Sequence, residues 1–278
     1  MKPVTYTTVF SFILLCLLSC RESPKEDNIF ITANNLYSQQ EYEQCIALIS
    51  EHESQKTKNT PEQQFYLSNL KMNSLFNLGY YNRCNKYLDT MLIKYPEKGA
   101  IYSRKAACYN RLKEYDSAIN NYSIALNFEK YNTTYLNNRG LVFIRKGKLA
   151  DAMKDFDSAI LLDSSMHSAY NGKGIVCEKK VQYDSALIYY SKAISLQKHY
   201  VYLCNRGILY LRMKLPAEGI GNLTESIALN EKYTLAITNK GYGFEMLNNY
   251  DSACVYWKKA IDMGNNEALN RYKTHCNK

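Results

Sequence analysis

Glycine and proline are scarce in this 278-residue chain, with 12 and 5 copies respectively. These two residues supply the backbone conformations of most tight turns, so a protein built from many short strands and turns is not expected. Tyrosine, by contrast, occurs 26 times, and 46% of all residues are hydrophobic. This composition is typical of a folded protein made of helices, with aromatic rings filling the spaces between them.

The signatures of catalysis and of metal binding are also missing. No Walker A sequence, G-x-S-x-G motif or pair of carboxylates in a catalytic arrangement stands out. The histidines, which are His52, His167, His199 and His275, belong to no C-x2-C or H-E-x-x-H pattern. We therefore predict no catalytic residue, no metal site and no cofactor, and we expect the chain not to be an enzyme.

Positive charge is in excess but is nowhere concentrated. Lysine and arginine number 35 against 26 acidic residues, which gives a net charge of +9. No basic run is longer than a pair such as Lys179-Lys180 or Lys258-Lys259, and no zinc-finger or RRM signature is present. A balance of this kind suits acidic proteins or anionic lipid headgroups. We expect no nucleic-acid partner.

An apolar segment runs from Val9 to Leu18 near the N-terminus. It is too short to span a bilayer as a helix, which takes about 20 residues. With Lys2 before it, the segment fits the core of a signal peptide. Ser19 and Cys20 follow, and the sequence Leu-Leu-Ser-Cys resembles the lipobox of bacterial lipoproteins.

In that family the signal peptide, here residues 1–19, is removed, and the cysteine carries acyl chains on its sulfur and its amino group. The resemblance implies a lipidated Cys20, a polar tether over residues 20–27 and firm anchoring. We expect a location in the cell envelope, anchored to a bacterial membrane, with the outer membrane favoured over the inner. The tether segment Lys25-Glu26-Asp27 is similar to a signal for surface export in some Bacteroidetes lipoproteins. A plain secretory signal and a solvated linker are the alternatives.

One pattern recurs about every 34 residues. A small residue precedes a large apolar residue by four positions, and the intervals between the small residues are 39, 34, 34, 34, 33 and 34. The small residues are Cys45, Cys84, Ala118, Ala152, Ala186, Gly219 and Ala253, and their large partners are Ile49, Leu88, Tyr122, Phe156, Tyr190, Leu223 and Trp257.

This repeat predicts pairs of packed helices. Each repeat divides into two stretches of about 12–14 residues with apolar residues at helical spacing, joined by a short turn. The small residues let two helix backbones approach, and the large residues fill the gap between one hairpin and the next. Because neither helix buries its apolar face alone, the hairpins must stack.

Three cysteines fall on core positions of this pattern. Cys45 and Cys84 occupy the small packing position, and Cys177 a core aromatic position, where free cysteine behaves as a small hydrophobe. Seven cysteines follow Cys20, an odd number that argues against a disulfide framework. Whether any of them pair is left open.

The spacing resembles the tetratricopeptide repeat (TPR), in which 34 residues carry a W-x2-L-G-x2-Y…A-x3-F…P outline. The residues that match it best are Tyr170, Gly174, Tyr183, Ala186, Tyr190 and Ala193. The resemblance implies an all-α TPR solenoid over residues 28–267, a right-handed superhelix of about seven hairpins, the first of them degenerate. The apolar stripe of residues 268–278 predicts a capping helix at its C-terminal end.

In the TPR family the first helix of each hairpin lines a concave groove that binds peptides. The resemblance places ten residues of this chain in the groove: Asn69, Arg111, Asn137, Leu141, Arg145, Asn171, Ile175, Lys179, Ile208 and Arg212. Asparagine amides pair with a peptide backbone, leucine and isoleucine offer apolar pockets, and the cations favour acidic side chains. The alternative role of the cations is to solvate helix ends and to interact with the helix dipoles.

The predicted function is therefore that of a membrane-anchored scaffold or adaptor. It would grip an extended or helical segment with acidic residues from another protein and attach to the membrane through the lipid on Cys20. The alternative is an accessory lipoprotein for nutrient or carbohydrate uptake at the outer membrane, which would require exposed tyrosine or tryptophan rings.

Overall fold

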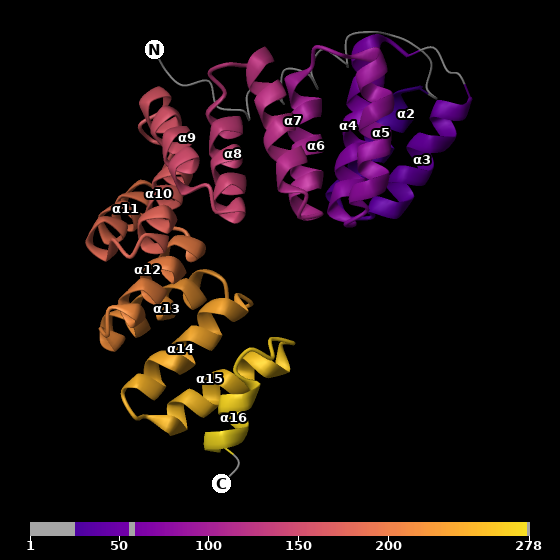
Figure 1. Ribbon diagram of the computed structural model, residues 1–278. Coiled ribbons are helices and arrows are strands. Elements are labelled where there is room, and N and C mark those ends of the chain that lie inside the picture. The colour runs from indigo at the N-terminus through magenta and orange to yellow at the C-terminus, as the bar shows by residue number, and fades with distance from the viewer. Residues whose placement is uncertain (1–25, 56–58, 277–278) are drawn as a thin grey trace. The chain divides into compact units, whose positions relative to one another are not determined.

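The computed structural model describes residues 26–55 and 59–276, and every regular element within them is a helix (Figure 1). The all-α prediction is therefore confirmed for this part of the chain. The helices divide into two compact units, the first ending at Glu97 and the second beginning at Lys98. The predicted signal peptide, Cys20 and the tether up to residue 25 lie outside the described residues.

Both units are built from helix hairpins. The first unit pairs α2 (Glu26–Ser38) with α3 (Tyr42–Ser54), and α4 (Pro61–Asn77) with α5 (Tyr81–Lys94). The second unit pairs α6 (Gly99–Arg111) with α7 (Tyr115–Phe128), α8 (Thr133–Lys146) with α9 (Leu149–Leu162), α10 (His167–Lys179) with α11 (Tyr183–Leu196), α12 (Tyr200–Arg212) with α13 (Pro216–Leu229), and α14 (Thr234–Met246) with α15 (Tyr250–Asp262), and ends in the short α16 (Leu269–Cys276).

The turn between the two helices has the same geometry in every hairpin. In each turn a single residue, one or two positions after the end of the first helix, adopts a left-handed conformation, with φ between 58° and 81°. The next N–H then donates to a carbonyl five residues back, as from Gln182 to Cys177 at 2.9 Å, which closes a Schellman-type helix end. Glycine fills the left-handed place only at Gly79 and Gly147, whereas the β-branched Val181 adopts it at φ 61° against its steric preference.

The repeated small and large residues form the core, as the sequence predicts. All seven large partners are at most 3% exposed, and the small cysteines and alanines are fully buried. Glycines on the first helices make room for the rings: a Cβ at Gly174 would lie 2.5 Å from the ring of Tyr190, and one at Gly241 would lie 2.4 Å from Trp257. The close approach of the two helices therefore depends on the missing side chain.

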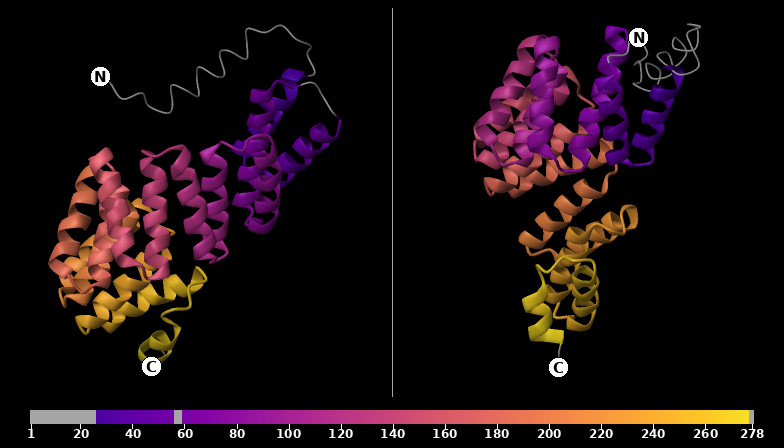
Figure 2. Two further views of the ribbon diagram at one scale, coloured as in Figure 1. Left: turned by 45° about the horizontal axis from the view of Figure 1, so that its top comes forward. Right: turned by 90° about the vertical axis from the view of Figure 1, so that its right-hand side faces the viewer.

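The hairpins of the second unit stack in chain order (Figure 2). Each second helix packs on the first helix that follows it, and α10 also contacts α8 and α12 directly. Helix α12 in turn contacts α14. The first helices thus form a continuous row along this unit, which is the row to which the sequence assigns binding.

The last hairpin is closed by α16, which lies on α15. Ala268, just before α16, is fully buried beside Trp257 and Ala253. A disulfide joins Cys254 of α15 to Cys276 at the end of α16. This bridge answers the question that the sequence left open for one pair, and it fastens the predicted capping helix to the stack.

Candidate protein-binding surface

The predicted groove residues divide between the two units. Asn69 lies half-buried on α4 of the first unit, whereas the other nine lie on α6, α8, α10 and α12 of the second. The structure therefore brings those nine together on one row of helices, whereas Asn69 belongs to the other unit.

The asparagine side chains of this row are largely used inside the protein. Asn137 on α8 and Asn171 on α10 are only 6% and 7% exposed. The side-chain amide of Asn205 on α12 donates to Asn171 Oδ1 at 2.9 Å, which links two neighbouring first helices. Asn137 donates to Asn138 at 3.5 Å, and its own Oδ1 has no hydrogen-bond partner in the described structure. The Asn205–Asn171 bond thus holds α10 and α12 in register, whereas Asn137 keeps one buried acceptor without a partner.

The apolar residues of the row are more accessible. Leu141, Ile175 and Ile208 are each the ninth residue of their helix, and all three are half-buried. They pack at the edge of the buried clusters without being enclosed by them. Three successive first helices therefore present a partly exposed aliphatic side chain at the same level.

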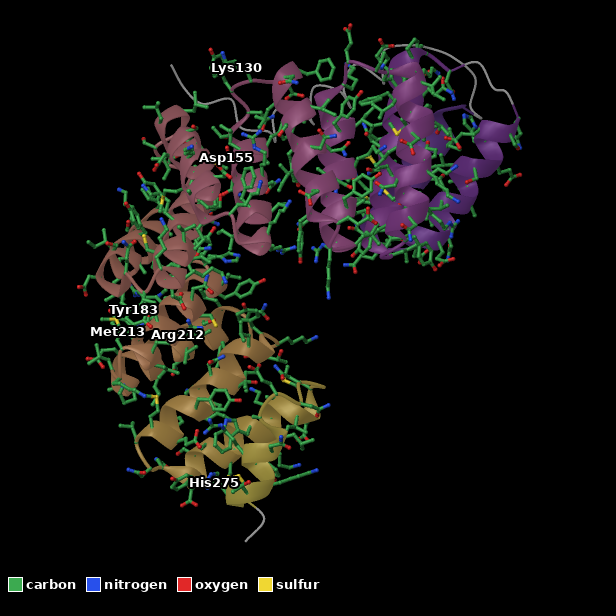
Figure 3. All side chains as sticks on the ribbon, viewed as in Figure 1. Lys130, Asp155, Tyr183, Arg212, Met213 and His275 are labelled. Atoms are coloured by element: carbon green, nitrogen blue, oxygen red, sulfur yellow. A yellow bond between two sulfur atoms is a disulfide. The ribbon has the colours of Figure 1, made fainter. Side chains whose placement is uncertain are left out.

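The cations at the thirteenth position form an exposed series at the ends of four helices: Arg111, Arg145, Lys179 and Arg212. Two of them bind residues of the preceding first helix. Arg145 Nη1 donates to Asn110 Oδ1 at 2.8 Å. Arg212, labelled in Figure 3, lies 3.1 Å from Glu178 Oε1, and Glu178 also accepts a hydrogen bond from the buried Tyr190 hydroxyl at 2.6 Å.

An ion pair similar to that between Arg212 and Glu178 occurs at the C-terminal end. Glu245 is the twelfth residue of α14, and Arg271 of α16 binds both of its carboxylate oxygens at 2.5 Å. His275 of the same helix, labelled in Figure 3, approaches Glu245 to 3.8 Å. The capping helix thus supplies the cation that a further hairpin would supply. Lys179 differs from these residues because it forms no ion pair or side-chain hydrogen bond within residues 29–55 and 59–276.

A second cationic series was not predicted from the sequence. The seventh residue of every first helix in the second unit is basic: Lys105, Arg139, Lys173, Arg206 and Lys240. These residues recur with the same period as the apolar pattern, so the signal is present in the sequence. The small and large core residues alone do not reveal it, because the cations occupy a different position of each repeat.

Arg139 shows how this second series is held. Its guanidinium makes two hydrogen bonds of 2.8 Å to the carboxylate of Asp155 on α9 and a third, of 2.9 Å, to Ser123 Oγ on α7. Asp155, labelled in Figure 3, is only 6% exposed. The seventh residue of a first helix therefore joins its own second helix to the preceding one, and it lies on the opposite side of the helix from the groove positions.

The free thiols of the described residues are buried. Cys204 is fully buried, and burial raises the pKa of its thiol to about 12. Burial also raises the pKa values of Cys45 and Cys177. Thiols in this state stay protonated and are poor nucleophiles at neutral pH. Cys45, Cys84 and Cys177 are buried in the core, which confirms the role predicted for them.

Metal ligands and membrane-spanning helices are both missing from the described residues. These residues contain no group of three or more histidine, cysteine or acidic side chains placed to hold a metal ion. None of their helices combines the length and the apolar character needed to cross a bilayer.

Comparison with known sequences agrees with this architecture. Residues 167–200, which cover α10 and α11, match the family model of the tetratricopeptide repeat. Human tetratricopeptide repeat protein 6 is 24% identical over 200 residues, which make up 71% of this chain and 34% of that protein. The chain thus spans about a third of the length of this curated relative.

Solved structures show the same fold. A tetratricopeptide repeat protein from Parabacteroides merdae superposes with a TM-score of 0.73 at 18% identity, covering 90% of this chain and 98% of that one. Yeast Tom70 gives a TM-score of 0.65 at 16% identity over 92% of this chain and 61% of its own. The APC/C hetero-tetramer Cut9–Hcn1 gives 0.65 at 15% identity over 89% and 55%. The predicted fold class, a TPR-type α-solenoid, is confirmed.

Proposed function

We propose that this chain is a non-catalytic TPR adaptor that binds a segment of another protein along the first helices of its second unit. The observation that carries the proposal is the repeated pairing of an aliphatic residue with a cation. Leu141, Ile175 and Ile208 are partly exposed, and each lies four residues before an exposed cation. Residues four apart lie on the same helix face. A polypeptide with apolar and acidic side chains complements such a surface.

Lys179 is the cation best suited to test this proposal, because no partner within the described residues occupies it. Replacing Lys179 with glutamate is expected to weaken partner binding roughly five- to tenfold, since one exposed ion pair contributes up to ~1 kcal/mol and reversal adds repulsion. Partner binding can be measured as cross-linking yield in intact cell envelopes, with a photoreactive amino acid at position 175.

The neighbouring residue provides a matched control. Lys180→Glu makes the same change in net charge at an exposed residue that follows α10, one position off the binding face. This variant should retain the wild-type yield. A photoreactive group at position 188, where Ile188 is 68% exposed on the second helix α11, should cross-link no partner. Equal losses for Lys179→Glu and Lys180→Glu, or equal yields from positions 175 and 188, would refute the proposed surface.

Membrane anchoring through Cys20 is part of the same proposal and rests on the lipobox-like sequence. Growth with labelled palmitate is expected to label the wild-type chain, while Cys20→Ser abolishes the label and releases the protein from the membrane fraction. Cys16→Ser is the matched control, because Cys16 lies within the apolar run and carries no lipid in this scheme. Unchanged labelling of Cys20→Ser would exclude a lipid on that residue.

The envelope location, with the outer membrane favoured, and an acidic partner segment complete the proposal. The nutrient-uptake alternative stays a prediction without a supporting contact. Carbohydrates bind by stacking on exposed aromatic rings; Trp257 is fully buried in the core, although single tyrosines such as Tyr131 are exposed. Tyr122 and Tyr190 are likewise buried at their repeat positions.

A further inference from the structure

The cations at the seventh position of the first helices are partnered in different ways. Arg206 Nε donates to Asn222 Oδ1 at 2.8 Å, and its Nη1 donates to Ser191 Oγ at 3.0 Å. Lys173 Nζ donates to Asp157 Oδ1 at 2.7 Å. In both cases one contact comes from the ninth residue of the preceding second helix, Ser191 or Asp157. The ninth residue of a second helix is therefore the position that can supply a polar or anionic partner to the cation of the next first helix.

Lys173 and Lys240 have similar surroundings, which differ at this ninth residue. Lys173 Nζ lies 4.4 Å from the ring centroid of Tyr189, and Lys240 Nζ lies 4.4 Å from that of Tyr256, the equivalent residue of the last hairpin. Beside Lys173 lies the carboxylate of Asp157. The residue at the equivalent position near Lys240 is Thr224, the ninth residue of α13. The surroundings of Lys240 therefore lack the anion that those of Lys173 contain.

Lys240 has no anion beside its ammonium group in the described structure. It is only 7% exposed, and it has no ion pair and no side-chain hydrogen bond in the described structure. The Thr224 hydroxyl is turned to its own helix and donates to the Ile220 carbonyl at 2.7 Å. The rings of Tyr256 and Phe244, at 4.4 and 6.0 Å, stabilise the ammonium through cation–π contacts. The Nζ atom is not among the fully buried polar atoms, so the ammonium can be reached from solvent although the rest of the side chain is buried.

The missing partner's place is accessible from solvent. In the matched site the Asp157 side chain remains 55% exposed although that of Lys173 is only 14% exposed, so the carboxylate lies at the surface above a half-buried lysine. Thr224 is exposed, and a side chain at Gly221, one turn earlier on α13, would meet nothing within 4 Å. On α15, Val255 precedes Tyr256 in the sequence and is 65% exposed.

We infer that Lys240 and Tyr256, between α13 and α15, form a binding site for the carboxylate of an aspartate or glutamate side chain of a partner polypeptide. A carboxylate is the ligand because Asp157 fills the equivalent place beside Lys173. The partner residues on either side of the carboxylate would contact the open surface at Gly221 and the exposed side chain of Val255. This site is separate from the groove positions, since the seventh and ninth residues of a helix point to opposite sides.

The test uses a zero-length carbodiimide, which joins an ammonium to a carboxylate only when the two are in contact. The probe is a glycine–serine peptide containing Leu-Asp-Leu, and its twin contains Leu-Asn-Leu. With the full chain, mass spectrometry should place the Leu-Asp-Leu peptide on Lys240 in preference to the exposed Lys258 and Lys259. The asparagine twin should give no Lys240 product.

Two substitutions at Thr224 make the test specific. Thr224→Asp recreates the Lys173 site internally and is expected to lower the Lys240–peptide yield at least about tenfold, because the ammonium then has its own anion. Thr224→Asn matches it in size without the charge and should leave the yield within about twofold. Both changes lie on an exposed helix surface, and the helical circular dichroism signal verifies folding.

Three results would overturn the inference: a yield unaffected by Thr224→Asp, a peptide attached only to Lys258 and Lys259, or an equal product from the asparagine twin. The outcome is independent of the groove proposal, because Lys179→Glu should leave the Lys240 product unchanged. Loss of the product in Lys179→Glu would instead show that the peptide is held by the groove.

Discussion

Phe156→Ala is expected to lower the free energy of unfolding by about 3–5 kcal/mol, at the upper end of the range for buried aromatic residues. The ring is fully buried and lies against two glycines, Gly140 of its own hairpin and Gly172 of the next. A Cβ at these positions would lie 2.7 and 2.4 Å from ring atoms. Because glycine has no side chain that could move into the space, the cavity stays open. Urea denaturation followed by circular dichroism measures the loss.

Because of the position of Phe156, this variant should also change the cooperativity of unfolding. Its ring lies between α8 and α10, so its loss weakens the contact between two hairpins as well as the hairpin itself. In a stack where each repeat contacts only its neighbours, weakening one interface lowers cooperativity. We therefore expect a broader transition with a reduced m-value. Ile188→Ala, at a 68% exposed residue, should change stability by less than about 0.5 kcal/mol. A loss below about 1 kcal/mol for Phe156→Ala would contradict the interlocking of ring and glycines.

The fold was predictable because each hairpin is encoded locally. The second helices begin at Tyr115, Leu149, Tyr183 and Tyr250, each three residues before the small residue found in the sequence. A repeat fixes the helix boundaries, the core residues and the turn at once, and the next repeat confirms them. Even Val181 takes the left-handed turn conformation that glycine adopts at Gly147, because the packing on both sides imposes it.

The contacts between repeats were less predictable. Nothing in the spacing assigns Glu178 to Arg212 or Asn205 to Asn171, because these bonds depend on how far one hairpin is rotated against the next. The disulfide is a similar case: Cys276 follows the last repeat, so no register relates it to Cys254. The groove asparagines were identified correctly as lying on the first helices, but burial and mutual hydrogen bonding follow from packing that a single repeat does not contain.

Arg139→Met is expected to cost about 3–5 kcal/mol, because it leaves the carboxylate of Asp155 buried without its cation. Asp155 is only 6% exposed and receives two hydrogen bonds of 2.8 Å from Arg139. The methionine retains most of the aliphatic volume, so the loss reports on charge and hydrogen bonding more than on packing. The free energy of unfolding from urea titration at neutral pH is the measurement. Removing the anion as well, in Arg139→Met with Asp155→Leu, should recover most of the stability.

Arg206→Met provides the control that isolates the buried charge. Arg206 occupies the same position two hairpins later and makes equivalent bonds, but its partners Asn222 and Ser191 are neutral. Removing it leaves half-buried amide and hydroxyl groups without this partner and should cost only about 1–2 kcal/mol. If the two variants were equally destabilised, packing of the arginine stem would account for most of the loss at both sites. A clear excess for Arg139 would show that one repeat position serves as a hydrogen-bonded link in one hairpin and as a buried ion pair in another, which is the variation that leaves Lys240 without a partner.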